Sequence, residues 1–323
     1  MLTFNDLFGS VGWFNGRRRT ISDPKIKAEI KMWKQLHHPN ICRFIAYTIE
    51  QSAICFLVSE LANGRDLFHV CAGHEPKLFE HPHFTVSLIR QIADALHYMH
   101  NHLEMVHGDI KPENILLHVV PTPRERKWRK SSALIMRRSD LGELLHETRS
   151  IHTYVEVIFQ LGDFGSTKRI KDKHARKFGG TLQFIAPEFL CLTASPKSRA
   201  PLNPPSFDPR AQDMWAFGLT LWQICMHDDD PLDVYEVRDV LPRRYGGTMD
   251  ISKSTPLIRS QTDLGDRFLH RYRQRYGVVP SEHWQWLIGG LTTFRIPARL
   301  RVKDLRESFH NSDREKRKKY MMQ

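Results

Sequence analysis

The chain has 323 residues, of which 41% are hydrophobic, so it can bury one large core or two small ones. Its five cysteines are odd in number and form no C-x-x-C pair, which predicts neither a zinc site nor a disulfide framework and favours a reducing, intracellular compartment, cytoplasmic or nuclear. The N-terminus has no basic region followed by an apolar run, and no run of about eighteen apolar residues occurs, so neither a secretory leader nor a membrane partner is expected.

The formal net charge of +12 raises the hypothesis of a nucleic-acid or membrane-surface ligand. Much of the excess lies in two short stretches. Residues 124–138 hold seven basic residues against one acidic residue, and residues 313–319 hold five against two. Because such confined clusters are usually solvated surface, nucleic acid is not expected to be a primary partner.

The first hundred residues predict an α-helix, two strands and a second, longer helix. Apolar residues at helical spacing and Asp23-Pro24 at the start predict a helix from Pro24 to Leu36. Apolar and β-branched residues predict strands over 41–47 and 53–59, and a turn at 63–67 leads into a short helix. The amphipathic stripe from Phe84 to Leu103 is typical of a helix that covers a core.

The long helix leads to the stretch from Val106 to Leu117, in which polar side chains stand in a loop broken by glycine and proline. Asp109 and Asn114 lie five residues apart with Lys111 between them, and an apolar strand follows. This set suits phosphoryl transfer, where an aspartate accepts a hydroxyl proton, an amide oxygen holds a metal and a lysine meets the phosphoryl charge.

Further motifs follow in the second half of the chain. Residues 155–161 predict a strand that ends just before Asp163-Phe164-Gly165, and Ala186-Pro187-Glu188 comes later. The segment from Asp213 to Trp222 is apolar around most of its circumference, which predicts a buried helix.

In this order, the Asp109 loop, the Asp163-Phe164-Gly165 triplet and Ala186-Pro187-Glu188 resemble the catalytic loop, metal-binding triplet and activation-segment end of eukaryotic serine/threonine protein kinases. The resemblance implies an α+β, two-lobed protein kinase-like fold with a truncated, β-rich small lobe and a mainly helical large lobe. It divides the chain into an incomplete small lobe with a hinge (1–62), a large catalytic lobe (63–310) and a basic tail (311–323).

The resemblance also implies the chemistry of the site. Asp109 would orient and deprotonate the substrate hydroxyl, Lys111 would meet the γ-phosphate of ATP, and Asn114 and Asp163 would hold Mg²⁺. Lys111 together with Thr181 implies serine or threonine of a protein substrate as the acceptor. In the family, the aspartate that corresponds to Asp213 anchors the catalytic loop from beneath, and Arg299 would pair with Glu188.

Five more residues correspond to nucleotide-binding positions of the family. The backbone of Glu60 and Ala62 would bind the adenine edge, and Leu116 would contribute to the same nucleotide site. Glu29 would pair with the strand lysine that holds the phosphates. Asp66 would reach the ribose, although an N-cap of the following helix is an equal interpretation.

The family pattern is incomplete at the N-terminus. Residues 8–12 hold two glycines where a glycine-rich loop has three, and the first lysine is Lys25, only four residues before Glu29 in the same predicted helix. A truncated N-terminus, compensation by Arg17, Arg18 or Arg19, and a pseudokinase scaffold that binds nucleotide or partners without turnover are the three explanations.

Two other departures matter. Residues 118–154 stand where the family has a short hairpin, so this stretch is interpreted as an insertion that is disordered, with a brief helix at 140–147. Gly108 stands where most family members have arginine, which predicts activity that depends little on phosphorylation of the activation loop. His107-Gly108-Asp109 also raises a small-molecule phosphotransferase of the aminoglycoside or choline kinase type as a less favoured alternative.

Overall fold

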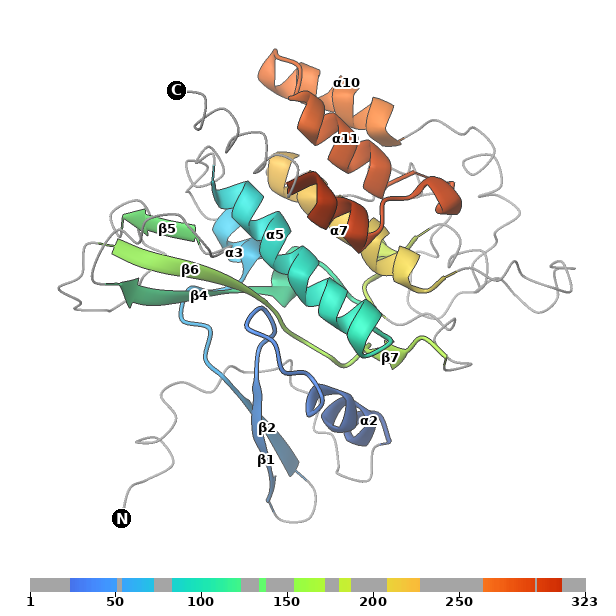
Figure 1. The fold of residues 1–323 in the computed structure, drawn as a ribbon. Coiled ribbons are helices and arrows are strands. Elements are labelled where there is room, and N and C mark those ends of the chain that lie inside the picture. The colour runs from blue at the N-terminus through green and yellow to red at the C-terminus, as the bar shows by residue number, and fades with distance from the viewer. Residues whose placement is uncertain are drawn as a thin grey trace, which may run out of the picture.

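The protein is represented by a computed structural model, in which residues 24–50, 54–72, 83–122, 134–137, 154–171, 180–186, 208–226, 264–293 and 295–309 are described (Figure 1). Several sequence features lie outside these ranges. They are the glycines of residues 8–12, the arginines of 17–19, the helix expected at 140–147, Glu188 and the basic tail.

The small-lobe part consists of helix α2 (Pro24–Trp33) and an antiparallel pair of strands, β1 (Phe44–Glu50) and β2 (Ile54–Ser59), which lie together in Figure 1. Both strands begin slightly later than expected. The reason is that residues 40–42 join the large lobe: Cys42 N–H donates to Leu161 O at 2.8 Å, and Leu161 N–H donates to Asn40 O at 2.9 Å. The helix ends three residues before Leu36, where the chain closes into a turn.

Two helices and a short strand lead to the predicted loop. Helix α3 (Leu67–Ala72) is followed by α5 (Phe84–His97), which continues through a π-helical turn, η1 (Tyr98–His102), to β3 (Met105–Val106). This confirms the long helix expected from Phe84. Its inward face is closed to solvent, with Leu88, Ile92 and Leu96 fully buried.

The stretch expected to be a disordered insertion contributes to a sheet instead. Strands β4 (Ile115–Thr122) and β6 (Tyr154–Leu161) pair along their whole length, and β5 (Leu134–Arg137) adds to the free side of β6. The prediction of disorder is therefore wrong for residues 118–122 and 134–137. Apolar residues alternate along both long strands and pack inward, so the strands run on beyond a short hairpin.

The three-stranded sheet packs on α5. The rings of Phe84 and Phe159 meet edge to face with centroids 5.1 Å apart, and Leu134 from β5 is 1% exposed in the same core. Gln91 of α5 joins the layers through hydrogen bonds, because its Oε1 accepts from Phe159 N–H at 2.9 Å and from Asn40 Nδ2 at 2.6 Å. The sheet is thus an integral part of the large-lobe core.

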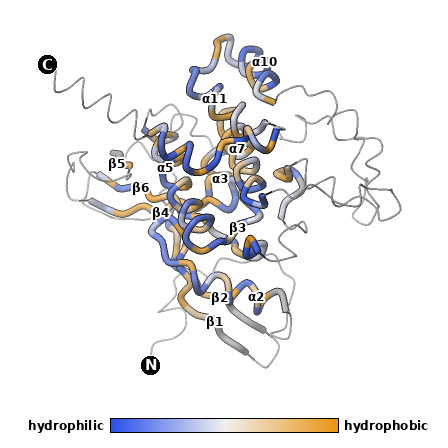
Figure 2. The backbone as a smooth tube through the Cα atoms, turned by 45° about the vertical axis from the view of Figure 1, so that its right-hand side comes forward, coloured by the Kyte–Doolittle hydropathy of each residue, from blue (hydrophilic) through white to orange (hydrophobic). Residues whose placement is uncertain are grey.

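The rest of the large lobe is helical. Helix α7 (Arg210–Met226) lies at its centre and is covered by α11 (Glu282–Leu291), which packs against α10 (Leu264–Tyr276) (Figure 1). Apolar backbone segments run through α7 and the sheet in Figure 2, and α10 carries more of the hydrophilic positions. A Cβ at Gly218 of α7 would lie 2.7 Å from Leu291 Cβ, so the two helices approach at a point that only glycine allows.

The remaining short elements are β7 (Lys168–Arg169) and the 3₁₀ turns η2 (Pro112–Asn114), η4 (Leu182–Phe184) and η7 (Ile296–Ala298), followed by a helix over 302–309. Arg299 after η7 donates to Thr293 O at 3.0 Å and to Ala211 O at 3.0 Å, and its guanidinium lies 4.9 Å from the Trp215 ring. Its expected pairing with Glu188 falls outside the described residues and stays a prediction.

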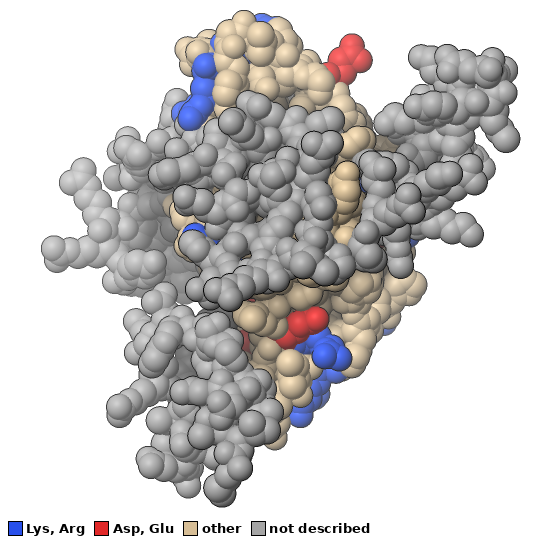
Figure 3. Space-filling view, turned by 90° about the vertical axis from the view of Figure 1, so that its left-hand side faces the viewer, with Lys and Arg blue, Asp and Glu red and all other residues tan. Residues whose placement is uncertain are grey.

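The surface of the described part is mixed in charge. On the face in Figure 3, the described Lys and Arg side chains form small separate groups, one of them beside acidic side chains. Among the helices of the described ranges, none has the length and apolar character needed to cross a membrane.

The buried position of Leu134 gives a test of the sheet. We expect Leu134→Ala to lower the free energy of unfolding by about 2–5 kcal/mol, because it removes a core side chain and leaves a cavity. The neighbouring Ile135 is only partly buried, so Ile135→Ala is the matched control and should cost about 1 kcal/mol. Urea unfolding of both variants measures the difference, and equal effects would contradict the packing of β5.

Candidate active site

Two short strand pairings bring the two predicted motifs together. Val106 of β3 is paired with Lys168 of β7, and Ile115 of β4 is paired with Leu161 of β6. The loop that carries Asp109 and the turn that carries Asp163 therefore both lie between the same pairs of strands. Gly162 N–H also donates to Asn114 O at 2.9 Å, which fixes the two segments side by side.

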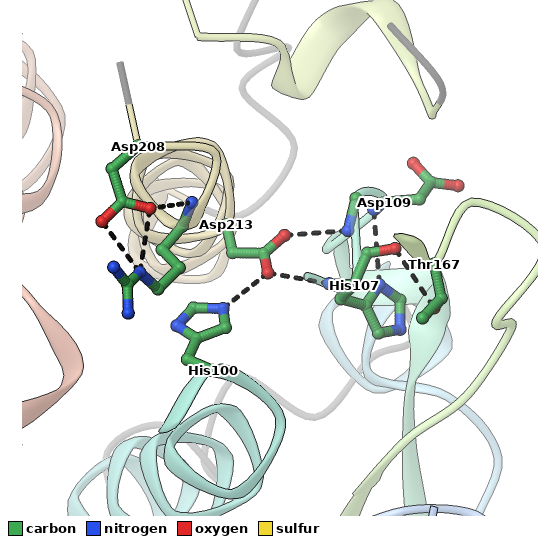
Figure 4. Close-up of polar contacts among 8 residues, drawn as sticks. His100, His107, Asp109, Thr167, Asp208 and Asp213 are labelled. Atoms are coloured by element: carbon green, nitrogen blue, oxygen red, sulfur yellow. Dashed lines mark hydrogen bonds and ion pairs between the residues drawn. The ribbon is translucent and has the colours of Figure 1, made fainter. Parts of the chain in front are cut away.

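The Asp109 loop is held from beneath by a fully buried carboxylate, that of Asp213 at the start of α7. Its oxygens accept hydrogen bonds from His107 N–H and Gly108 N–H, both at 2.8 Å (Figure 4). His100 of η1 lies on the other side, with Nε2 2.7 Å from Asp213 Oδ2. Since a carboxylate only accepts, the His100 ring donates.

Two opposing effects act on the pKa of Asp213. Burial raises the pKa, because a charged carboxylate is poorly solvated there, but the hydrogen bond and charge of His100 and the backbone hydrogen bond of Gly108 lower it. The net direction is downward, so Asp213 is ionised. The ionised carboxylate can accept all three hydrogen bonds, two from backbone N–H groups and one from the imidazole.

His107 connects this anchor to the Asp163 turn. Its Nε2 donates to Gly162 O at 3.0 Å, and its Nδ1 accepts from Asp109 N–H at 3.3 Å, which fits a neutral ring protonated on Nε2. The ring also meets Phe164 edge to face with centroids 5.3 Å apart, and Phe164 in turn packs on Trp33 of α2 at 5.4 Å. A continuous aromatic contact thus joins α2 to the catalytic loop.

The Asp109 carboxylate points away from Asp213, as Figure 4 shows, and meets the activation segment. Its Oδ1 accepts from Thr181 N–H at 2.7 Å, while its Oδ2 lies 3.3 Å from Asn114 Nδ2 and 3.5 Å from Lys111 Nζ. Lys111 Nζ also donates to Thr181 Oγ1 at 2.8 Å. The structure therefore brings together the aspartate, lysine and threonine that the sequence analysis connected with hydroxyl phosphorylation.

Glycine is required where the activation segment crosses this loop. Gly180 has φ +112°, and a Cβ there would overlap Gly108 O and lie 3.1 Å from Asp109 Oδ1. Gly108 itself has φ +82°, and its Cβ would lie 2.8 Å from Ser166 O. A side chain at either position would strain the backbone and separate the two segments.

Asn114 and Asp163 have the donor atoms that a magnesium site needs. The Asn114 Nδ2 donates to Asp109 O at 2.8 Å, which orients the amide so that Oδ1 is the free oxygen among the described contacts. Asp163 has φ +58°, and its Oδ1 accepts from Gly165 N–H at 3.2 Å. Magnesium commonly binds through one or two protein oxygens together with phosphates and water, so the pair fits it. Within the described ranges, no group of three or more His, Cys, Asp or Glu gathers to hold a metal.

Glu29 lies at the edge of the same turn. A Cβ on Gly165 would be 3.2 Å from Asp163 Oδ1 and 3.5 Å from Glu29 Oε2, so both carboxylates border this glycine. Lys25 belongs to α2 together with Glu29, as the sequence spacing indicated. The expected pairing of Glu29 with a strand lysine that holds the phosphates stays a prediction.

The other predicted nucleotide residues lie along the start of the large lobe. Asp66 forms a bridge pair with Leu116, and the Leu116 side chain lies against Gly162, where a Cβ would be 2.9 Å from its Cδ1. Asp66 acts as an N-cap: its Oδ1 accepts from His69 N–H at 2.8 Å, and its Oδ2 lies 2.7 Å from His69 Nδ1. The capping interpretation is thus confirmed, and a ribose contact stays a prediction.

The backbone of Glu60 and Ala62 connects β2 to α3. Glu60 N–H is used within the protein, since it donates to Arg43 O at 2.9 Å, and Cys42 Sγ lies 3.5 Å from Glu60 O. Burial raises the pKa of the Cys42 thiol to about 11, so this thiol is protonated beside the hinge. The part of Glu60 and Ala62 in adenine binding stays a prediction.

The sequence analysis missed His100 and Gly180. His100 follows Leu96 by four residues on the apolar stripe of the long helix, and a polar residue on such a stripe was the available signal. Gly180 was part of the quoted Gly179-Gly180-Thr181 run, but its close approach to Gly108 depends on a contact across 72 residues of chain.

A strand-rich part with one helix, a helical part, and two facing loops that present Asp109, Asn114 and Asp163 between them define the protein kinase class of fold. A family model for the protein kinase domain matches residues 15–241. Because that match covers more than half of the 323 residues, the chain belongs to the protein kinase family.

Individual relatives are more distant. The chain is 29% identical over 215 residues to serine/threonine-protein kinase srk1 of Schizosaccharomyces pombe, a match that covers 64% of this chain and 32% of that protein. It is 24% identical over 236 residues to mitogen-activated protein kinase kinase kinase 10 of Mus musculus, covering 72% and 20%. It is 24% identical over 302 residues to SNF-related serine/threonine-protein kinase of Homo sapiens, covering 91% and 32%. The chain spans about a third or less of the length of these relatives.

Asp213 provides a test of the anchor. In Asp213→Asn, one carboxylate oxygen becomes an NH₂ group that faces other donors, so we expect the free energy of unfolding at pH 7 to fall by about 3 kcal/mol. Because the folded pKa is depressed, the contribution of Asp213 is complete above its unfolded pKa of about 3.9 and is lost as the pH falls through the lower folded pKa. The difference between the two proteins should stay constant down to about pH 5 and shrink below about pH 4.

Urea unfolding across this pH range measures that difference. Asp208→Asn is the control, because Asp208 forms an exposed pair with Arg210 just before the same helix and should contribute less than about 1 kcal/mol. A difference for Asp213→Asn that grows on acidification would contradict the assignment.

Proposed function

We propose that the chain is a serine/threonine protein kinase that transfers the γ-phosphate of ATP to a hydroxyl of a protein substrate. The observation that carries the proposal is the convergence of Asp109, Lys111, Asn114 and Asp163 on two adjacent loops anchored by the buried Asp213. The match to the protein kinase domain supports the same reaction.

In this proposal Asp109 orients the substrate hydroxyl and accepts its proton. Its carboxylate is held by Thr181 N–H and by the Asn114 amide, so its direction is set before substrate arrives. Lys111 lies 3.5 Å from that carboxylate and donates to Thr181, which places a positive charge where phosphoryl charge develops. Asn114 and Asp163 would hold Mg²⁺, whose charge would offset the negative charge of the phosphates.

The nucleotide would lie against Leu116, with the adenine edge at Glu60 to Ala62 and the phosphates toward Asp163. Support comes from the position of Leu116, whose side chain borders Gly162 while its backbone pairs with Asp66. Serine or threonine as the acceptor is supported by the Lys111–Thr181 hydrogen bond and by the names of two relatives, srk1 and the SNF-related kinase.

A nucleotide-binding scaffold without turnover is the alternative, and one observation favours it. Lys25 belongs to α2 together with Glu29, so Lys25 is not the strand lysine that would pair with Glu29. A preorganised donor facing developing charge is worth about 10²–10³ in rate, so its absence would leave a slow or inactive site. A small-molecule phosphotransferase of the aminoglycoside or choline type is a third, less favoured hypothesis. In that class the second metal-binding aspartate lies outside an Asp-Phe-Gly triplet, whereas such a triplet is present here.

Phosphate transfer to a generic basic protein tests the proposal. We expect Asp163→Asn to reduce the rate by about 10²-fold or more, because it removes the carboxylate of the metal pair. Glu113→Gln is the matched control: Glu113 is an exposed carboxylate of the same loop and should leave the rate unchanged. Equal rates for the native chain and Asp163→Asn would remove the enzyme assignment.

Thermal unfolding separates the alternatives, because a ligand that binds only the folded state raises its stability. We expect ATP with Mg²⁺ to raise the unfolding temperature of the native chain and to lose most of this effect when EDTA removes the metal. Stabilisation without any transfer would favour the scaffold. Transfer to an aminoglycoside or choline, with none to protein, would favour the small-molecule enzyme.

A further inference from the structure

The hinge segment that follows Glu60 is tied to strand β4 by an unusual set of contacts. The side-chain amide of Asn63 bonds to both backbone groups of Val119: Asn63 Nδ2 donates to Val119 O at 2.9 Å, and Val119 N–H donates to Asn63 Oδ1 at 2.7 Å. One amide side chain thus takes the place of a neighbouring strand at this edge.

The same edge of β4 carries further bonds to the following residues. Gly64 N–H donates to Leu117 O, and Leu117 N–H donates to Arg65 O, both at 2.8 Å. His118 Nδ1 lies 3.1 Å from Leu61 O, and because a carbonyl only accepts, this nitrogen carries the proton. Residues 61 and 63–65 are therefore all bonded to residues 117–119.

The backbone geometry indicates that this attachment is tight. A Cβ on Gly64 would lie 2.9 Å from Leu117 O and 3.0 Å from Val119 Cγ2, so no larger residue fits between the hinge segment and β4. Arg65 has φ +65°, a conformation that a residue with a side chain keeps only when its surroundings hold it there. The hydrogen bond from Leu117 N–H to Arg65 O provides such a restraint.

Three of these five contacts belong to the part of β4 that a short hairpin would lack. His118 and Val119 lie in the extension over 118–122, which pairs with β6 up to Tyr154, and β6 is itself paired with β5. The extended sheet is anchored in the core through Leu134 and Val157. A rigid sheet therefore holds the segment on which the adenine edge is expected to bind.

We propose that Asn63 and His118 are positioning residues for the adenine site, and that the strand extension over 118–122 sets nucleotide affinity by fixing the hinge backbone. This inference rests on the proposed function, because it assumes that adenine binds at Glu60 to Ala62. It assigns neither residue a contact with the nucleotide. Their effect comes from holding backbone donors and acceptors in place before the ligand arrives.

Direct binding to the full chain tests the inference without any need for turnover. ADP and inorganic tripolyphosphate, each with Mg²⁺, are titrated calorimetrically, because only ADP carries the adenine that the hinge would read. For Asn63→Ala we expect the dissociation constant of ADP to rise about tenfold and that of tripolyphosphate to stay unchanged. For His118→Ala, which removes one bond instead of two, we expect a rise of about threefold for ADP alone.

Gln285→Ala is the matched control, because the Gln285 amide donates to Pro280 O at 2.8 Å on α11, away from the hinge. It should change neither dissociation constant. Unchanged ADP binding in both hinge variants, or an equal loss for ADP and tripolyphosphate, would overturn the inference. If Asn63→Ala does not fold, His118→Ala decides by the same comparison.

The two proposals fail in different ways. A native chain that binds ADP through the hinge as expected but transfers no phosphate would remove the enzyme assignment and leave this inference standing. A native chain that binds neither probe would overturn both.

Discussion

The fully buried carboxylate of Asp213 is the interaction on which the rest of the site depends. It collects two backbone N–H groups of the catalytic loop and the imidazole of His100, so that α7, the end of the long helix and the loop meet at one charged group. In the same loop, His107 is hydrogen-bonded to Gly162 O and packs on Phe164. Phe164 in turn packs on Trp33 of α2, so these contacts connect the anchored loop to α2. The backbone of the Asp109 loop is thus fixed by Asp213 on one side, and the Asp109 carboxylate points away from Asp213.

Much of this arrangement could be predicted from the sequence, because its signals are local. The run around Asp109 and the triplet at Asp163 stand beside apolar strands, and the pairing of those strands brings the motifs together. The buried helix beginning near Asp213 could also be predicted, since its residues are apolar around most of its circumference. In each case, a short stretch holds both the chemistry and the element that positions it.

The parts that escaped prediction depend on contacts between distant residues. Leu134-Ile135-Met136 is apolar, but no residue near it predicts that a four-residue strand will pair with β6. From the sequence alone, Asn63 is interpreted as a turn residue, because its contact with Val119 depends on the extension of β4. The requirement for glycine at 180 likewise depends on the close approach of Gly108 in the folded chain. The basic, proline-containing composition of this stretch does not favour long strands. Burial of their apolar side chains against α5 outweighs that local preference.

The wide turn at the end of the long helix has a consequence of its own. In η1 the Leu103 N–H donates to Tyr98 O, five residues back, so the turn holds one residue more than an α-helical turn would. Met99 and His100, neighbours in sequence, are both buried in this turn. Since each residue of an α-helix adds about 100° of rotation, removing one residue from this turn would rotate the helix before it relative to the chain after it by roughly that angle. The number of residues between Leu96 and Met105 therefore helps to set how the helix that carries His100 is oriented toward Asp213.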